Sequence, residues 1–291
     1  SNIKRSYKIK LKNISVLSNI FSFLFCIYKT FKYKKTNYLL ISITPYTFLS
    51  YLFLFIFRKK IFVYLRSNGH EEYKAIFGII GFLIYHVMYI CVTFKSNIIV
   101  CQSRLVKNKK IDLVFPSRLD ENWLKTNTNL LLDKPRLLYV GRIRVEKGIF
   151  SLFKLYDEMT IDLELSIVGR TEDLKAKVNK KINFLGFGYD TASLIKVYDN
   201  HNIFILPSFT EAHPQVLDES LARKRPVIIF EEISHIIKNR YGVFISKRNV
   251  QSLTETIAFI MNNYSTIQES MSQNKLPTRL KFISQMTDIL S

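Results

Sequence analysis

The sequence predicts an α/β protein built from two Rossmann-like domains. The stretch FILPSFTEAHPQVLDESLARKRPVIIF at 204–230 is typical of a strand, a loop, a helix and a second strand. A similar strand, helix and strand are expected over 38–65. The length of 291 residues, with 48% hydrophobic, suits two domains with their own cores. Parallel sheets of this kind bind ligands at the carboxyl ends of their strands.

The first domain is expected to span residues 1–120. Weak alternation of apolar residues indicates a strand at 7–11, and a Phe-rich and Leu-rich run indicates a helix at 14–31. Further apolar runs predict strands at 38–43, 61–65 and 98–102 and helices at 45–57 and 76–94. A strand and helix alternate throughout, which favours a parallel sheet.

Two apolar runs, 38–57 and 76–94, are long enough and uncharged enough to cross a membrane on length alone. Pro45 interrupts the first run at a junction between strand and helix, and His86 with two glycines weakens the second. We therefore predict a buried α/β core with apolar, basic helices that lie on the membrane interface.

Positive charge is concentrated in the first domain. Residues 1–120 contain 20 basic and 4 acidic side chains, which accounts for +16 of the net charge of +20. An anionic membrane surface is the expected partner, and nucleic acid is the alternative. No helix-turn-helix, RNP-like or zinc pattern supports nucleic acid. A Lys-rich genomic composition is another source of the excess.

The cysteines indicate a reducing compartment. Cys26, Cys91 and Cys101 have no metal-binding spacing, and their odd number argues against a disulfide framework. The start of the chain, SNIKRSYKIKLKN, lacks the apolar core of a signal peptide. We expect a cytoplasmic protein at the inner face of the membrane.

A polar segment at 121–135 is the predicted linker, and the second domain is predicted at 136–275. Its expected strands are 136–140, 163–168, 182–185, 204–206 and 227–230, with helices at 192–199 and 253–262 and one that has Pro214 in its first turn. Arg223, Lys224 and Arg225 are expected to end that helix with charge that suits its negative pole. A last helix is expected at 279–290 within the segment 276–291.

Two glutamates in the second domain indicate chemistry. Glu211 lies in the loop after a predicted strand, and Glu219 lies eight residues later in the next helix. The N–H groups of Gln215 and Val216 begin that helix and can bind an anion. The carboxylate of Glu219, a turn further in, can accept hydrogen bonds from hydroxyl groups of a ligand. Most glutamates at such a spacing are solvated surface charges, which is the alternative.

A second loop carries cations after another predicted strand. In YVGRIRVEKGI, Arg142 and Lys147 are five residues apart, and two cations on one loop can hold a diphosphate. Gly141 lets the backbone approach a ligand closely.

Together these stretches resemble the retaining GT-B glycosyltransferases of glycosyltransferase family 4 (glycosyl transferases group 1). The matching residues are Gly141, Arg142, Lys147, Gly148, Pro207, Ser208, Glu211, Glu219, Ala222, Pro226, Val227 and Ile228. The chain departs where the family has glycine, at Ala212, Pro214 and Lys224. It also lacks a glycine-rich loop after the first strand, because all nine glycines lie at or after position 69. The first domain is therefore expected to be shortened or truncated.

The resemblance implies a GT-B fold with two domains facing each other across a cleft and a last helix that returns to the first domain. It implies a hexosyltransferase that moves a sugar, with retention, from a nucleotide diphosphate sugar to a glycan or lipid-linked acceptor. The expected setting is synthesis of a cell-surface polysaccharide, such as lipopolysaccharide or capsule, or of a glycolipid. No cofactor is expected beyond the nucleotide sugar as co-substrate. No metal is expected either, because the sequence has no Asp-x-Asp pair.

The resemblance also implies roles for individual residues. His70 follows a predicted strand of the first domain and is a catalytic candidate with Glu211. The expected donor site comprises Arg142, Lys147, Gln215 and Val216 for the diphosphate, Glu219 for the ribose, Ala212 and His213 for the sugar, and Leu185, Gly186 and Phe187 beside the base.

Two other functions stay open at this point. The basic first domain, with interleaved Tyr and Phe, admits a nucleic-acid-binding protein. The missing glycine loop, together with Ala212, Pro214 and Lys224, admits a catalytically degenerate transferase fold that acts as a sugar-binding subunit.

Overall fold

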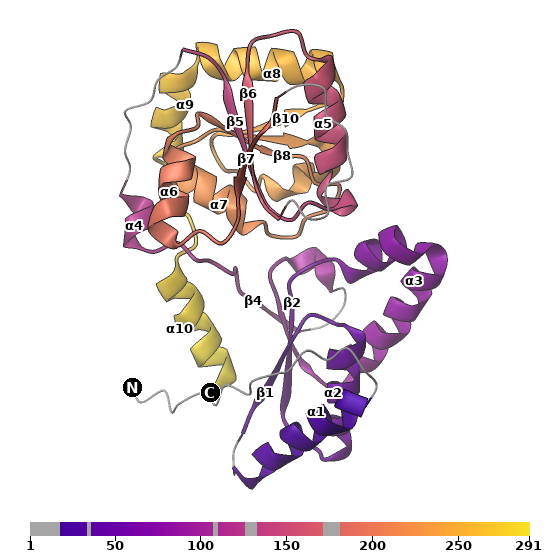
Figure 1. Ribbon diagram of the computed structural model, residues 1–291. Coiled ribbons are helices and arrows are strands. Elements are labelled where there is room, and N and C mark those ends of the chain that lie inside the picture. Colours follow the sequence, from indigo (N-terminus) through magenta and orange to yellow (C-terminus); the bar gives the residue numbers. More distant parts are fainter. Residues whose placement is uncertain (1–17, 34–35, 107–109, 126–132, 171–180) are drawn as a thin grey trace.

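The computed structural model describes residues 18–33, 36–106, 110–125, 133–170 and 181–291. Figure 1 shows two α/β domains, one above the other, with the carboxyl-terminal helix beside the lower one. The strand predicted at 7–11 and the start of the helix predicted at 14–31 lie outside the described residues.

The first domain has a parallel sheet in the order β1-β2-β3-β4. Its strands are β1 (Tyr38–Ile41), β2 (Ile61–Leu65), β3 (Asn97–Val100) and β4 (Ile111–Leu113). Its helices are α1 (Ser18–Lys29), η1 (Thr30–Lys32), α2 (Pro45–Ile56), α3 (Gly69–Phe94) and η2 (Ser103–Leu105). The predicted strand 38–43 ends at Ile41, and the predicted helix 45–57 forms as α2.

The two faces of this sheet are covered by different helices, as Figure 1 shows. Ile61, Val63 and Leu65 alternate with Phe62 and Tyr64, so β2 sends apolar side chains to both faces. The first set packs with residues of α2 and α3. The second set packs with residues of α10 (Arg279–Leu290), the last helix of the chain.

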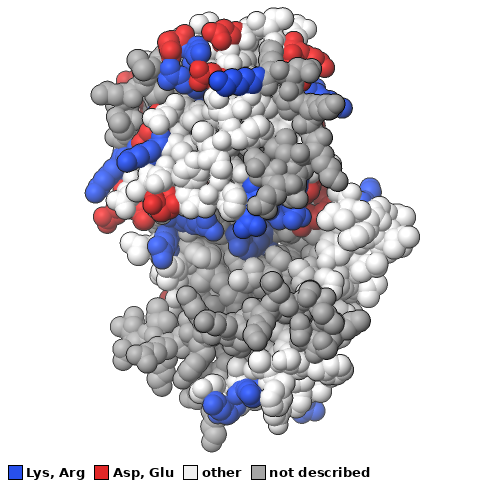
Figure 2. Space-filling view, in the orientation of Figure 1, with Lys and Arg blue, Asp and Glu red and all other residues white. Residues whose placement is uncertain are grey.

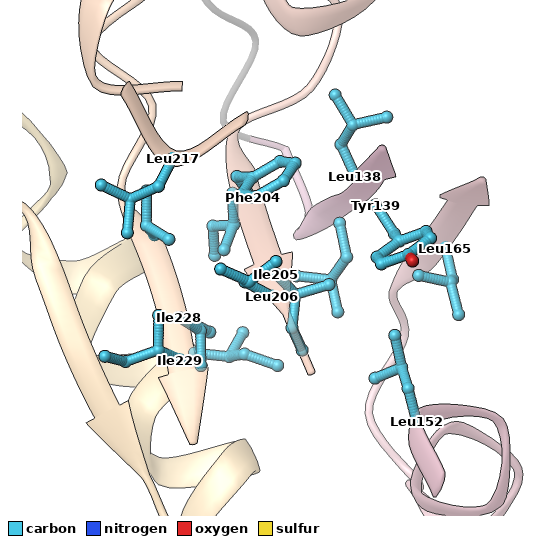
Figure 3. Packing of buried hydrophobic residues seen from close by; sticks show 14 of the residues in the cluster. Leu138, Tyr139, Leu152, Leu165, Phe204, Ile205, Leu206, Leu217, Ile228 and Ile229 are labelled. Carbon is cyan, nitrogen blue, oxygen red and sulfur yellow. The ribbon is translucent and has the colours of Figure 1, made fainter. Parts of the chain in front are cut away.

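The second domain has a six-stranded parallel sheet in the order β10-β9-β8-β5-β6-β7. The strands are β5 (Arg136–Val140), β6 (Glu164–Val168), β7 (Asn183–Gly186), β8 (Ile203–Leu206), β9 (Val227–Phe230) and β10 (Val243–Ser246). The helices are α4 (Glu121–Leu124), η3 (Val145–Lys147), α5 (Ile149–Glu158), α6 (Thr191–Asp199), α7 (Gln215–Ala222), η4 (Glu231–Ile236), α8 (Val250–Asn262) and α9 (Tyr264–Met271). Figure 3 shows Phe204, Ile205 and Leu206 of β8 packed between side chains of the neighbouring strands.

The chain reverses its direction across this sheet beside β5. From β5 it proceeds outward to β6 and β7, and it then returns to place β8 on the other side of β5. Ligands in open α/β sheets bind at such a reversal, outside the carboxyl ends of the two strands. The loops after β5 and β8 are therefore the expected ligand site.

The chain crosses between the domains twice, at 114–118 and at 276–278. The Ser117 hydroxyl donates to the Pro277 carbonyl at 2.6 Å, so the two crossings are hydrogen bonded to each other. Trp123 lies within the segment 121–135 predicted as linker, yet it is buried in the core of the second domain. Beyond the second crossing, α10 packs on the first sheet through Phe282 and Met286.

The structure changes one prediction about the first domain. The helix expected at 76–94 begins earlier, at Gly69, and it bends at Gly78, whose φ of 64° interrupts the helical backbone. The sequence predicts that apolar helices of this domain lie on the membrane interface, and most apolar side chains of this helix are exposed. Apolar composition alone does not distinguish a helix buried on all sides from one with an uncovered face.

The end of α7 also differs from the sequence prediction. Pro214 lies at the N-cap, one position before the helix, and the helix ends at Ala222. Arg223 and Arg225 do not act as solvated charges at the helix end. Both are buried and pair with Asp199, at 2.8 Å and 3.5 Å respectively. Lys224 between them has a φ of 52°, the left-handed conformation in which helices commonly carry glycine.

We predict that Lys224→Gly raises the free energy of unfolding by about 1 kcal/mol, because glycine adopts a positive φ without a Cβ clash. Urea unfolding measures the change. Lys224→Ala is the control, since it removes the same charge and keeps the Cβ. Equal stability of the glycine and alanine variants would contradict the strain at this position.

Candidate functional site

A cavity of about 420 Å³ lies between the two domains at the carboxyl ends of both sheets. Its second-domain lining comprises Arg142, Lys147, Thr210, Glu211, Ala212 and His213. Its first-domain lining comes from the loops after β1 and β2 and from the first turn of α3: Ser42, Ile43, Thr44, Leu65, Arg66, Ser67, Asn68, Gly69, Glu72 and Tyr73, joined by Tyr85. Figure 2 shows Lys and Arg side chains gathered along the boundary between the domains. The cavity therefore suits an anionic ligand held by both domains.

The loops after β5 and β8 are held together at one side of this cavity. Gly148 has a φ of 65°, and a Cβ at this position would lie 1.8 Å from the Pro207 carbonyl oxygen. The backbone N–H of Phe209 also donates to the Glu146 carbonyl at 3.0 Å. Glycine is therefore required here for both conformation and space.

This close approach places Lys147 beside Glu211. Lys147 Nζ lies 2.6 Å from Glu211 Oε1, and the same oxygen accepts a hydrogen bond from Ser208 Oγ at 2.8 Å. Both charged side chains are largely buried, and both line the cavity. Lys147 and Glu211, which belong to two separate motifs of the sequence, thus form one charged centre.

The backbone of Glu211 is fixed from both domains. Its carbonyl accepts from His235 Nε2 at 2.8 Å and from Arg104 Nη2, in the first domain, at 3.2 Å. Burial lowers the pKa of His235, which favours the neutral imidazole with its proton on Nε2. Thr210 adds a further link across the cleft by donating to Glu71 Oε2 at 2.6 Å. The position of Glu211 thus depends on how the domains are arranged.

His213 lies against a buried carboxylate. Its Nε2 is 2.8 Å from Asp218 Oδ2, and Asp218 also pairs with Arg240. The ring lies 5.2 Å from that of Phe115, in the crossing segment. Ala212, the other residue assigned to the donor sugar, lines the cavity and packs with first-domain residues. These contacts hold the loop after Glu211 close to the first domain.

The first domain supplies helix starts and a carboxylate to the cavity. Thr44 caps α2, and its hydroxyl accepts from the Thr47 N–H at 3.3 Å, so the positive end of the helix dipole is directed at the cavity wall. Ser42 stands in the loop after β1 with a φ of 62°, in a chain that lacks glycine there. Burial raises the pKa of Glu72, although a hydrogen bond with Ser67 and the charges of Lys147 and Arg142 act against this shift.

Glu219 lies one turn inside α7 and is only 5% exposed. Its Oε2 accepts from the Tyr198 hydroxyl at 3.0 Å, and burial raises the pKa of the carboxyl. Glu219 is not among the residues that line the cavity, and neither are Gln215 and Val216 at the start of the helix. The three residues follow His213 along the chain, and their expected roles in binding the donor stay predictions.

His70 is placed on another side of α3 from the cavity lining. Its Nε2 lies 3.1 Å from His86 Nδ1. Its ring packs against the rings of Tyr85 and Tyr89, with centroid distances of 4.7 Å and 5.1 Å. Neighbouring Gly69 and Glu72 line the cavity, but His70 does not. The catalytic role expected for His70 therefore stays a prediction without a contact in this arrangement.

The loop expected beside the base follows β7. Gly186 accepts from the Gly169 N–H at 2.8 Å, which joins this loop to the one after β6. Phe187 is exposed under Arg170, whose guanidinium carbon is 4.7 Å from the ring centroid. The hydroxyl of Tyr189 donates to the Leu185 carbonyl. An exposed aromatic ring at the carboxyl edge of the sheet can stack on a base.

Within the described residues, no group of three or more His, Cys, Asp or Glu side chains could hold a metal ion. The positive charges at the cavity come from Arg142, Lys147 and Arg66.

The sequence comparisons identify the family. Residues 120–276, more than half of the chain, match the family Glycosyl transferases group 1. The chain belongs to this family. It is also 26% identical over 265 residues to the capsular polysaccharide biosynthesis glycosyltransferase CapM of Staphylococcus aureus, covering 80% of this chain and 69% of CapM.

Solved structures show the fold of this group 1 glycosyltransferase. Sucrose-phosphate synthase from Thermosynechococcus elongatus superimposes with a TM-score of 0.75 at 17% identity, covering 96% of this chain and 79% of that one. HepE from Anabaena, in complex with UDP and glucose, superimposes with a TM-score of 0.70 at 13% identity, covering 93% and 80%. The fold is GT-B, as the two motifs indicate.

Several residues of this candidate site carry little signal in the sequence. Glu72 lines the cavity and follows β2 in the segment RSNGHEEY. In that segment the sequence favours the histidine, His70, as the functional candidate. Arg104 and His235 lie far from both motifs and reach Glu211 only through the fold. One sequence signal for the cavity was available: the two adjacent carboxylates Glu71 and Glu72 follow a predicted strand, where α/β sheets bind ligands.

We predict that Glu219→Gln removes a pH-dependent loss of stability. Because the folded-state pKa of Glu219 is raised, its contribution to stability is present below the ordinary glutamate pKa of about 4.3 and is lost as pH rises through the folded-state value. The advantage of the glutamine variant in urea unfolding should therefore be greater at pH 7.5 than at pH 4. Glu269→Gln, on the exposed face of α9, is the control. If the glutamine variant and the parent differ in free energy of unfolding by the same amount at pH 4 and pH 7.5, the raised pKa of Glu219 is contradicted.

Proposed function

We propose that this protein transfers a hexose from a nucleoside diphosphate sugar to a glycan or lipid-linked acceptor, with retention of configuration and without a metal ion. The single observation that carries the proposal is the charged centre of Lys147 and Glu211, at the reversal of the second sheet and facing the first domain. Cations that can hold a diphosphate and a carboxylate that can face a sugar are thereby brought to one cavity.

The donor is proposed to extend across the second domain. Its diphosphate lies against Arg142, Lys147 and the amino end of α7, where helix N–H groups favour an anion. The ribose reaches Glu219, and the base lies at the loop with Phe187. The sugar lies in the cavity beside Glu211, with Ala212 and His213 nearby. HepE, a structural neighbour, binds UDP, so UDP is the first nucleotide to test.

In the proposed reaction, the acceptor hydroxyl oxygen bonds to the anomeric carbon on the face from which the nucleotide leaves. The bond from that carbon to the diphosphate oxygen breaks, and the departing phosphate takes the acceptor proton. Arg142 and Lys147 stabilise the charge that develops on the leaving diphosphate. The Glu211 carboxylate stabilises the positive charge that develops on the sugar, since Oε1 is held by Lys147 and Ser208. No covalent intermediate with the enzyme is required.

The acceptor side of the cavity belongs to the first domain. Glu72, Ser67 and Ser42 offer polar groups suited to sugar hydroxyls, and they lie across the cavity from Glu211. CapM is a capsular polysaccharide biosynthesis enzyme by name. We therefore propose that the product belongs to a cell-surface polysaccharide or a glycolipid.

We predict that Arg142→Ala and Lys147→Ala each weaken binding of the cognate nucleotide by about 1.5 to 3 kcal/mol, the usual range for hydrogen bonds with charged groups. Calorimetry with UDP, GDP and ADP identifies the nucleotide and measures the loss. Arg144→Ala is the matched control, because Arg144 is an exposed arginine of the same loop that does not line the cavity. Unchanged affinity in both variants would remove these cations from the phosphate site.

We predict that Glu211→Gln lowers turnover by about two orders of magnitude with little change in the Kd of the bare nucleotide, because the carboxylate acts mainly in the transition state. Glu219→Gln should instead weaken nucleotide binding, since a neutral amide accepts ribose hydrogen bonds less strongly. The assay follows nucleotide release with a panel of donors in EDTA.

Three results would count against this view. If Glu211→Gln and Glu219→Gln both leave turnover and nucleotide affinity unchanged, the two carboxylates are surface charges. Activity that disappears in EDTA and returns with Mn²⁺ would contradict metal independence. Donor binding without hydrolysis or transfer would favour the sugar-binding subunit.

A further inference from the structure

Helix α3 has an apolar stripe that nothing in the described chain covers. The stripe follows helical spacing, and each of its members is more than half exposed: Ile76, Ile80, Leu83, Val87, Ile90 and Phe94. The opposite side of the same helix packs on the first sheet through Tyr85, Met88 and Val92. In Figure 2 the part of the surface formed by α3, at the right, is almost entirely uncharged. A patch of this kind marks an interaction site.

Helices α1 and α2 continue this apolar surface. Their exposed members are Phe21, Phe25 and Tyr28 of α1, and Leu52, Phe55 and Ile56 of α2, followed by Phe57. Ring contacts join the ends of these helices. The ring centroids of Tyr28 in α1 and of Phe57, which follows α2, are 5.9 Å apart, and those of Phe31 in η1 and Phe53 in α2 are also 5.9 Å apart. We call the exposed residues of α1, α2 and α3, with Phe57, the apolar face.

Lysines stand at the edge of the apolar face. Lys29 Nζ lies 4.7 Å from the ring centroid of Phe25, and Lys59 Nζ lies 4.3 Å from that of Phe31. Lys95 Nζ lies 5.8 Å from the ring of Phe55 and so joins the end of α3 to α2. The sequence from 18 to 100 has only two acidic residues, Glu71 and Glu72, and these face the second domain and the cavity.

We propose that the apolar face binds the surface of an anionic lipid bilayer, with α3 lying in the plane of the interface. Apolar side chains enter the acyl boundary while the lysines at the edge contact anionic headgroups. A second copy of the chain would instead bring two sets of lysines together without acidic partners. The complementarity of charge therefore favours the bilayer over self-association.

The fold argues against α3 crossing the membrane, although α3 is long and apolar enough to do so. Tyr85, Met88 and Val92 belong to the core of the first domain, so withdrawing the helix would expose that core. The bend at Gly78 also divides the helix. A helix held by its sheet on one side and uncovered on the other is suited to lie at an interface.

This surface lies close to the cavity, and the next step rests on the proposed function. Gly69, Glu72 and Tyr73 of α3 line the cavity, and the apolar stripe begins at Ile76 of the same helix. Seven residues of α-helix span about 10 Å. A bilayer on the apolar face thus brings a lipid-linked acceptor to the first-domain side of the cavity.

The test is flotation of the full chain with vesicles of phosphatidylcholine alone and of phosphatidylcholine mixed with phosphatidylglycerol. We expect binding to the anionic vesicles that falls about tenfold when salt is raised to about 0.5 M, where the Debye length is only a few Å. The double variant Ile80→Glu with Ile84→Glu should lose about tenfold or more in partition. Lys59→Gln with Lys95→Gln should lose binding to anionic vesicles only.

Two control variants share the chemistry but lie on the second domain: Ile245→Glu, an exposed apolar residue of β10, and Lys154→Gln with Lys196→Gln. Both should bind vesicles as the parent does. Nucleotide affinity measured on every variant shows that the fold and the donor site persist, which separates this proposal from the proposed function. Absence of vesicle binding by the parent, or equal losses in control and test variants, would overturn the proposal. Concentration-dependent dimerisation abolished by Ile80→Glu with Ile84→Glu would replace the bilayer with a second copy.

Discussion

The contact between the loops after β5 and β8 is the constraint on which the site depends. β5 and β8 are neighbours in the sheet but are separated in the chain by two other strands, so their loops meet only at the reversal of strand order. Because Gly148 has no Cβ, the Pro207 carbonyl oxygen can lie beside it; a Cβ at this position would be only 1.8 Å from that oxygen. The result is that Lys147 and Glu211 share one buried ion pair, which fixes both before any ligand arrives.

The two domains are joined by more than their crossing segments. Arg104 and Glu71 of the first domain hydrogen bond to Glu211 and Thr210 in the loop after β8. The last helix, α10, also returns from the second domain and packs with Phe62 and Tyr64, on the face of the first sheet that α2 and α3 do not cover. A change in the angle between the domains would alter the contacts of the Glu211 backbone. The position of the Glu211 backbone therefore depends on how the two domains are placed relative to each other.

The first domain has an uneven distribution of covered and uncovered surface. One side of α3 is core, and its other side has apolar residues of the same kinds exposed to solvent. Burying such side chains is favourable by about 1.5 to 3 kcal/mol each, so leaving them exposed has a large cost unless another surface covers them. Lysines lie beside Phe25, Phe31 and Phe55 at the edge of this surface.

The family resemblance of two motifs, around Arg142 and Glu211, predicted the GT-B fold. Runs of consecutive residues predicted the alternation of strands and helices and the two motifs themselves. These features depend on local patterns, since a buried strand, a helix start and a cation loop are each encoded in a few consecutive residues. Tertiary structure alone decided that Lys147 pairs with Glu211, that Arg104 and His235 hold the Glu211 carbonyl, and that Glu72 rather than His70 faces the cavity. It also decided which side of α3 is buried, because both sides are apolar and only the position of the sheet distinguishes them.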